Sequence, residues 1–161
     1  MDANTKAALE GFGEVWGRVC GSGGKAAVPR QDNTDLEDLR GFIADEACAA
    51  AFYEAAARRF GRFSARLREI ACDERGHLRA LQGEHFLLTG EICIPPPACP
   101  LPCGGLRVLR SAYLDELAAV EGYRKAAGAT GNAALADIYR RNASDEERHA
   151  GILKELILCA L

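Results

Sequence analysis

Two short stretches of the chain combine a glutamate with a histidine at helical spacing. Glu74 and His77 lie in the sequence CDERGHL, and Glu146 and His149 lie in SDEERHA. Residues i and i+3 share one face of an α-helix, so each carboxylate and its imidazole would project together. Carboxylate oxygens combined with imidazole nitrogens suit divalent metals such as iron or manganese. The two stretches therefore indicate a metal site.

Two further glutamates occupy equivalent positions in an internal repeat. The sequence DEACAAAFYEAAARRF, which begins at residue 45, aligns with DELAAVEGYRKAAGAT, which begins at residue 115. Glu46 and Tyr53 in the first copy correspond to Glu116 and Tyr123 in the second, with the tyrosine seven residues after the glutamate each time. Because the two Glu-x-x-His stretches repeat as well, the chain consists of two duplicated halves.

Four amphipathic segments carry these residues. Apolar and small side chains recur in each with a period near 3.6, which predicts α-helices, and strand-like alternation is absent from the sequence. The predicted helices run from Asp35 to Phe60, from Phe63 to Leu88, from Leu106 to Ala127 and from Asn132 to Leu158. A shorter helix from Thr5 to Val19 and a Gly-rich linker, residues 21–34, are expected before them.

The connections between these segments predict how the helices are arranged. Gly61 and the sequence GATGN, residues 128–132, are short breaks that favour antiparallel hairpins. The Pro-rich connection at residues 89–105 is long, and about fifteen such residues at ~3.1 Å each span ~45 Å. A helix of ~25 residues is only ~38 Å long. The linker can therefore return the chain so that the third helix runs parallel to the second, as in the one-crossover four-helix bundle.

Counting residues from the turns places the four glutamates at one height in such a bundle. Glu46 lies fifteen residues before Gly61 and Glu74 lies thirteen after it, and in the second hairpin both glutamates lie fifteen residues from the central glycine. Four buried carboxylates without a cation would repel one another at a large desolvation cost, which two divalent cations remove. The sequence therefore predicts six metal ligands: Glu46, Glu74, His77, Glu116, Glu146 and His149.

An aspartate precedes each of these glutamates, at positions 45, 73, 115 and 145. A side chain one residue earlier on a helix points ~100° away from the metal. Asp73 or Asp145 is therefore expected to accept the outer N–H of a ligand histidine on a neighbouring helix. His85 lies eleven residues past Glu74, which is ~16 Å along the helix axis, so we expect it to be a structural or surface residue.

Length and composition are those of an ordinary globular protein. The 161 residues suffice for one core, and we expect an N-terminal helix and linker at residues 1–34 and one bundle domain at residues 35–161. The net charge of −3, with basic residues scattered among acidic ones, disfavours nucleic acid as a partner. The sequence contains neither an apolar leader nor an apolar window of membrane length, so we expect no membrane partner and a cytoplasmic location.

The seven cysteines are an odd number, which fits thiols in a reducing compartment better than disulfides. Cys93, Cys99 and Cys103 lie in the Pro-rich linker at spacings that match no zinc or iron–sulfur motif. We expect these three residues to be loop thiols, and the sequence assigns them no role.

The six ligand positions and the two tyrosines resemble those of the ferritin-like superfamily of di-iron carboxylate proteins, and most closely its rubrerythrin branch. In that family two helices each give one glutamate and the other two each give Glu-x-x-His. The resemblance covers residues 35–158. It implies an all-α, ferritin-like four-helix bundle that holds two iron ions per site, with manganese or a mixed pair as the alternative. It also places Tyr53 and Tyr123 beside the metals as candidate catalytic residues.

The resemblance implies redox chemistry. A rubrerythrin-like peroxidase or oxidase would reduce hydrogen peroxide or dioxygen under oxidative stress. Its electrons would come from an external donor such as a rubredoxin-like protein, because the chain lacks the paired Cys-x-x-Cys motifs of an appended rubredoxin domain. Rubrerythrins usually carry an additional carboxylate three residues after the third-helix glutamate, and Ala119 stands there in this chain.

Other functions remain open at this stage. The main alternative is a non-catalytic iron-binding or iron-handling protein with a ferroxidase-like centre, and a storage-type ferritin shell is a weaker match. A metal-free helical interaction module is disfavoured by the cost of burying the glutamates. The family resemblance also implies a homodimer, and the long linker would allow hairpins to be exchanged between chains.

Overall fold

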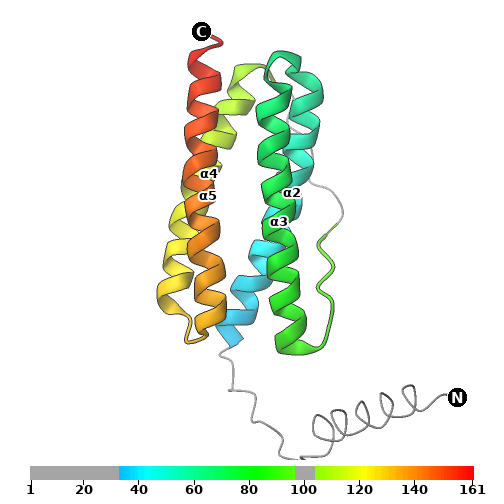
Figure 1. The fold of residues 1–161 in the computed structure, drawn as a ribbon, viewed down its shortest axis with the longest axis vertical. Helices are drawn as coiled ribbons and strands as arrows, with labels where there is room; N and C mark the ends of the chain where they lie inside the picture. The colour runs from blue at the N-terminus through cyan, green and yellow to red at the C-terminus, as the bar shows by residue number, and fades with distance from the viewer. Residues whose placement is uncertain (1–32, 97–103) are drawn as a thin grey trace, which may run out of the picture. The chain divides into compact units, whose positions relative to one another are not determined.

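The computed structural model describes residues 33–96 and 104–161, which form four long α-helices (Figure 1). The helices are α2 at Asn33–Arg59, α3 at Ser64–Thr89, α4 at Leu106–Ala129 and α5 at Ala133–Leu158, and a 3-10 turn, η1 at Gly61–Phe63, joins α2 to α3. For these four α-helices, each predicted end is confirmed to within two residues. The short helix expected from Thr5 to Val19 lies outside the described residues, as does nearly all of the linker expected to follow it.

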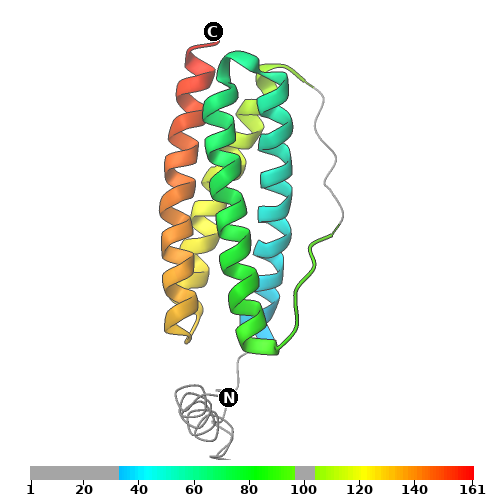
Figure 2. The same ribbon diagram turned by 45° about the vertical axis from the view of Figure 1, so that its right-hand side comes forward.

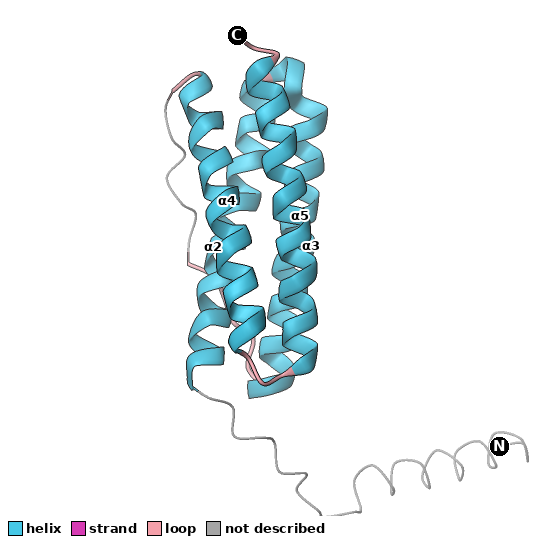
Figure 3. Ribbon diagram, turned by 90° about the vertical axis from the view of Figure 1, so that its left-hand side faces the viewer, coloured by secondary structure: helices cyan, strands magenta, loops and turns pink. Residues whose placement is uncertain are grey.

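The four helices form two antiparallel hairpins, α2 with α3 and α4 with α5. The chain leaves α3 at one end of the bundle and α4 begins at the opposite end, so α4 runs parallel to α3 (Figures 1 and 2). This arrangement is the predicted one-crossover topology. The described residues contain no β-strand (Figure 3).

Local sequence explains where the helices stop and start. Gly90 ends α3 with a φ of 74°, a left-handed conformation that glycine adopts without strain, and its N–H donates to the Phe86 carbonyl at 2.8 Å. Asn132 caps α5 by accepting hydrogen bonds from the backbone N–H groups of Ala134 and Leu135. The same asparagine donates to Glu84 of α3 at 3.2 Å, which ties the two hairpins together at this end of the bundle.

Two apolar clusters fill the interior, one toward each end of the helices. The cluster on the side of η1 includes Tyr53, Leu67, Ile70, Leu109 and Leu153. The cluster on the side of the α4–α5 loop includes Leu39, Ile43, Leu81, Tyr123, Leu135 and Tyr139. Each buried leucine or isoleucine stabilises the fold by about 1.5–3 kcal/mol. A layer of polar side chains lies between the clusters, and there the sequence predicts the metal site.

The cysteines depart from expectation at one position. Cys48 on α2 is disulfide-bonded, whereas Cys72, Cys93 and Cys159 are free. The expectation of thiols is therefore wrong for Cys48, because spacing along the chain does not show which cysteines the fold brings close. Cys99 and Cys103 also lie outside the described residues. None of the described helices is both long enough and apolar enough to cross a membrane.

Candidate metal centre

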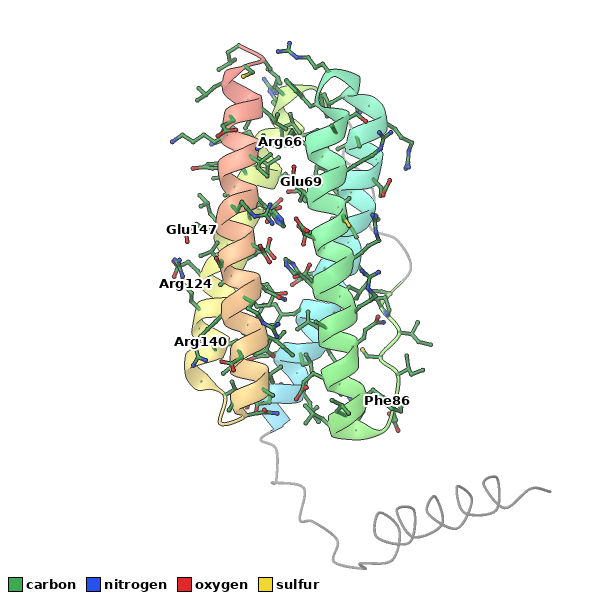
Figure 4. The ribbon with its side chains drawn as sticks, viewed as in Figure 1. Arg66, Glu69, Phe86, Arg124, Arg140 and Glu147 are labelled. Atoms are coloured by element: carbon green, nitrogen blue, oxygen red, sulfur yellow. The ribbon has the colours of Figure 1, made fainter. Side chains whose placement is uncertain are left out.

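The six predicted ligands converge in the polar layer between the two apolar clusters. Each of the four helices supplies one glutamate, and α3 and α5 each supply one histidine as well. Figure 4 shows oxygen- and nitrogen-bearing side chains from both hairpins meeting about halfway along the bundle. All six side chains are buried: Glu46, Glu74, His77, Glu116, Glu146 and His149.

The donor atoms form two overlapping groups. One group comprises Glu46, Glu74, His77 and Glu146, and the other comprises Glu74, Glu116, Glu146 and His149. Within each group the candidate ligand atoms lie within 4.8 Å of one another. Glu74 and Glu146 belong to both groups, so each group adds one glutamate and one histidine of its own. Such sharing is suited to two neighbouring cations with two carboxylates in common.

Each imidazole turns its Nδ1 toward the carboxylates. His77 Nδ1 lies 3.2 Å from Glu74, 3.4 Å from Glu46 and 3.1 Å from Glu146. His149 Nδ1 lies 3.1 Å from both Glu74 and Glu146. The two ring centroids are 5.9 Å apart. The histidines therefore lie side by side along one flank of the carboxylate cluster.

The outer nitrogen of each imidazole faces an aspartate of the other hairpin. His77 Nε2 lies 3.3 Å from Asp145 Oδ2, and His149 Nε2 lies 3.3 Å from Asp73 Oδ2. Arg148 joins the two aspartates, since its guanidinium donates to Asp73 at 2.9 Å and to Asp145 at 3.0 Å. The structure thus contains the contacts expected for Asp73 and Asp145. No sequence pattern distinguishes Arg148 from an ordinary solvent-exposed helix residue, so sequence reasoning missed it.

The two tyrosines make crossed contacts between the hairpins. The Tyr53 hydroxyl on α2 donates to Glu116 Oε1 on α4, and the Tyr123 hydroxyl on α4 donates to Glu46 Oε1 on α2. Both rings are buried, and burial together with the neighbouring glutamate raises the pKa of each phenol well above its usual value. Both hydroxyls therefore stay protonated at neutral pH and act as hydrogen-bond donors to the carboxylates.

The four carboxyl groups differ in their affinity for protons. Burial raises the pKa of Glu46 to about 8 and that of Glu116 to about 10. Burial also acts on Glu74 and Glu146, but the two adjacent imidazoles hold the pKa of both below its usual value. The shared glutamates are therefore anionic at pH 7, whereas the two unshared ones retain protons.

The imidazoles balance the charge of the shared glutamates. Burial by itself lowers the pKa of a histidine, but the carboxylates of Glu146 and Glu74 raise the pKa of His149 to about 10. The same two glutamates and Glu46 raise the pKa of His77 well above its usual value. The histidines and the unshared glutamates thus carry protons, and binding a cation would require these side chains to release them.

Two buried oxygens fit a bound cation directly. Among the described residues, Glu46 Oε2 and Glu74 Oε1 form no hydrogen bond, although an imidazole nitrogen lies 3.4 Å from the first and 3.1 Å from the second. A buried carboxylate oxygen without a donor costs about 1–3 kcal/mol or more. A divalent cation would satisfy both atoms, so the donor set fits a dinuclear centre.

A cavity of about 540 Å³ between α2 and α4 opens onto these carboxylates. All four ligand glutamates contribute to its lining. Ala119, at the position where rubrerythrins usually carry a further carboxylate, lines it as well, as do Asp45 and Asp115. The histidine flank lies between α3 and α5, so the cavity approaches the centre from a different pair of helices.

His85 lies in neither ligand group. It is buried, with Arg40 Nε donating to its Nε2 at 3.3 Å and the Glu91 carbonyl 2.9 Å from its Nδ1. These contacts fasten the chain after α3 to the bundle, which is the structural role expected from its position.

Comparison with known proteins shows which fold the chain shares with them. No family model matches the chain. The uncharacterized protein YhjR of Bacillus subtilis is 33% identical over 84 residues, which cover 52% of this chain and 58% of YhjR. A bacterioferritin of Rhodobacter capsulatus, described with a metal-free dinuclear site and a heme iron, matches with a TM-score of 0.69 at 22% identity over 80% of this chain and 86% of its own. The chain has the ferritin-like fold.

This ferritin-like bundle confirms the predicted fold class. The match is to a bacterioferritin, and at 22% identity it concerns the fold alone. The rubrerythrin-like branch therefore stays a prediction. The chain spans little more than half of the length of YhjR, so that relative contributes no function either.

Proposed function

We propose that this ferritin-like protein binds two iron ions in the six-residue centre and uses them to reduce hydrogen peroxide or dioxygen. Glu46 and His77 would hold one ion, Glu116 and His149 the other, and the two shared glutamates would contact both. Manganese or a mixed pair is the alternative, since oxygen donors with one imidazole per cation suit either metal. The proposal depends on one observation, that two buried four-residue ligand groups share two carboxylates.

The bound metal would supply the two electrons that convert hydrogen peroxide and two protons into two waters, and an external donor would replace them. The protein's own groups prepare the site. Asp73 and Asp145 would fix the orientation of the imidazoles, and Tyr53 and Tyr123 would hold one oxygen of each unshared glutamate. The apolar clusters lie on either side of the centre, and the cavity between α2 and α4 opens onto it.

A second candidate function is non-catalytic iron handling at a ferroxidase-like centre. Ala119 supports it, because the side chain that would extend the ligand set of a rubrerythrin-like peroxidase is missing. The likeness in fold to a bacterioferritin is compatible with the same role. Steady consumption of peroxide with an added reductant would support the enzyme, whereas a single stoichiometric oxidation of bound iron would support iron handling.

Metal analysis tests both candidates together. Protein loaded anaerobically with ferrous iron and freed of excess metal should retain about two ions per chain. Retention of less than about one ion would overturn the dinuclear centre and both functions with it. The Glu74→Gln variant is the control for surface-bound iron, because it removes a ligand common to both groups.

We also propose that the protein acts as a homodimer in the cytoplasm. Leu114 and Leu117 on α4 support a subunit interface, since 44% and 41% of these large apolar side chains are exposed. Sedimentation velocity on the wild type and on a Leu114→Glu, Leu117→Glu variant tests this assignment. A monomer at micromolar concentration would contradict it.

A further inference from the structure

The four aspartates that precede the ligand glutamates fall into two sets with opposite surroundings. Asp73 and Asp145 lie on the α3–α5 side, where each contacts an imidazole and the Arg148 guanidinium. Asp45 and Asp115 lie on α2 and α4, line the cavity and form no ion pair with any residue that the structure describes. Among the described residues, Asp115 has the Ser111 hydroxyl as a side-chain hydrogen-bond partner. The repeated Asp-Glu motif thus places two aspartates beside cationic side chains, whereas the other two have no cationic partner among the described residues.

The electrostatic character of the two sides differs accordingly. None of the described residues that line the cavity is a lysine, arginine or histidine, whereas aspartates, glutamates and Ser111 supply its polar wall. On the α3–α5 side, Arg148 stands over the two histidines, with its guanidinium 3.5 Å from His149 Nε2. A charged cleft with low-dielectric walls concentrates ions of the opposite sign. The cavity therefore attracts cations, whereas on the histidine side the nearby carboxylates already pair with Arg148.

The inner end of the cavity carries two carboxyl oxygens that lack a hydrogen bond. Glu46 and Glu74 line the cavity, are almost fully buried, and each keep one oxygen without a hydrogen-bond partner among the described residues. Asp45 precedes Glu46 directly, and Asp115 precedes Glu116. Each unshared ligand thus has an exposed aspartate beside it at the cavity wall.

We propose that divalent cations reach the centre through the α2–α4 cavity and that Asp45 and Asp115 are their first binding groups. The inference rests on the proposed dinuclear centre. An aspartate oxygen replaces part of the hydration shell of the incoming cation, and the adjacent glutamate then completes the exchange deeper in the cavity. The same negative wall disfavours anions, so the route selects cations and neutral molecules such as dioxygen and hydrogen peroxide.

Stopped-flow uptake of Co²⁺ by the full-length, EDTA-treated protein tests this route, with the cobalt absorption bands as the signal. The Asp45→Asn, Asp115→Asn double variant should bind Co²⁺ about tenfold more slowly at low ionic strength, with unchanged final stoichiometry. Its rate should also depend less on salt than the wild-type rate, because screening acts on the charges that were removed. An Asp45→Lys, Asp115→Lys variant should be slower still.

The matched control is Asp38→Asn, Glu121→Gln, which removes one exposed carboxylate from each of the same two helices outside the cavity lining. Equal slowing in the control and the test variant would overturn the access route, as would a test variant as fast as wild type. A wild-type protein that shows no cobalt bands would overturn the dinuclear centre as well. The two failures are therefore distinguishable. Far-UV circular dichroism verifies that each variant is folded.

Discussion

His77 Nε2 lies 3.3 Å from Asp145 Oδ2, although the two residues belong to different hairpins. The reciprocal contact joins His149 to Asp73 at the same distance. Arg148 closes the arrangement by donating to both aspartates. Each imidazole is thereby held at its outer nitrogen while its inner nitrogen faces the carboxylates. The structure thus fixes the orientation of two ligands through contacts that cross between α3 and α5.

Removal of one of these aspartates should weaken metal binding without abolishing it. Asp145→Ala leaves all six ligands in place but frees the outer nitrogen of His77, so we expect the affinity for Co²⁺ to fall about 10–100-fold. Competition with a metal-binding indicator dye measures the affinity. Asp137→Ala is the control, because that exposed aspartate of α5 pairs with Arg140 at the surface and belongs to neither ligand group. Unchanged affinity in Asp145→Ala would remove the positioning role.

The shared and unshared glutamates should differ in the metal stoichiometry of their variants. Glu46→Gln changes a residue of one ligand group, so one of the two ions should be lost and the other retained. Glu74→Gln changes both groups and should reduce the binding of both ions. Elemental analysis after gel filtration gives the ratio of metal to protein. Equal stoichiometry in the two variants would contradict the overlapping groups.

Metal binding should release protons. At pH 7 the Glu46 carboxyl, with a pKa of about 8, and the Glu116 carboxyl and His149 imidazole, each with a pKa of about 10, hold protons that ligation displaces. The apparent affinity should therefore rise with pH between about 6 and 9. Isothermal titration calorimetry in buffers of different ionisation enthalpy counts the protons released. Binding heats that are independent of the buffer would contradict this exchange.

The metal-free protein should lose stability as pH rises. The raised pKa values of Glu46, Glu116 and His149 mean that the folded state binds more protons than the unfolded state above about pH 5. The free energy of unfolding then decreases with increasing pH until these folded-state pKa values are passed, near pH 10. Urea denaturation of EDTA-treated protein at pH 5.5 and pH 8.5 tests the sign. Greater stability at the higher pH would show that it is wrong.

The two buried tyrosine environments provide a paired test of hydrogen bonding. Tyr123→Phe removes the donor to Glu46 Oε1 and leaves both oxygens of that carboxylate without a hydrogen bond, so it should destabilise the metal-free protein by about 1–3 kcal/mol. Tyr139→Phe is the control, since the buried Tyr139 hydroxyl has no hydrogen-bond partner in the part of the chain that the structure describes. Urea denaturation compares the variants. Equal losses of stability would contradict the role of the Tyr123 contact.

Much of the architecture could be predicted from the sequence because it depends on regular spacing. Helical periodicity and the breaks at Gly61 and Gly131 place the ends of α2, α3, α4 and α5 to within two residues. Counting from those breaks brings the six predicted ligands to one level, because antiparallel arms of equal length meet in register. Both properties are local, and neither requires knowledge of which side chains meet across helices.

The remaining features depend on neighbours that spacing does not specify. Asp45 and Asp73 occupy the same place in the Asp-Glu motif, yet one lines a cavity and the other pairs with Arg148. Periodicity assigns both to the same side of a ligand and gives no information about the helix that faces them. The disulfide at Cys48 escaped prediction for the same reason.

The Pro-rich linker joins two hairpins that share ligand glutamates. Each hairpin carries three of the six ligand residues. One glutamate of each hairpin also belongs to the ligand group whose other three residues come from the other hairpin. Two unlinked hairpins would therefore complete the centre only when they associate. Dilution would dissociate them, and the bound metal would be lost. Joining them in one chain replaces that bimolecular step by a high effective concentration. The single chain should therefore retain its two ions at concentrations at which two separate hairpins would dissociate.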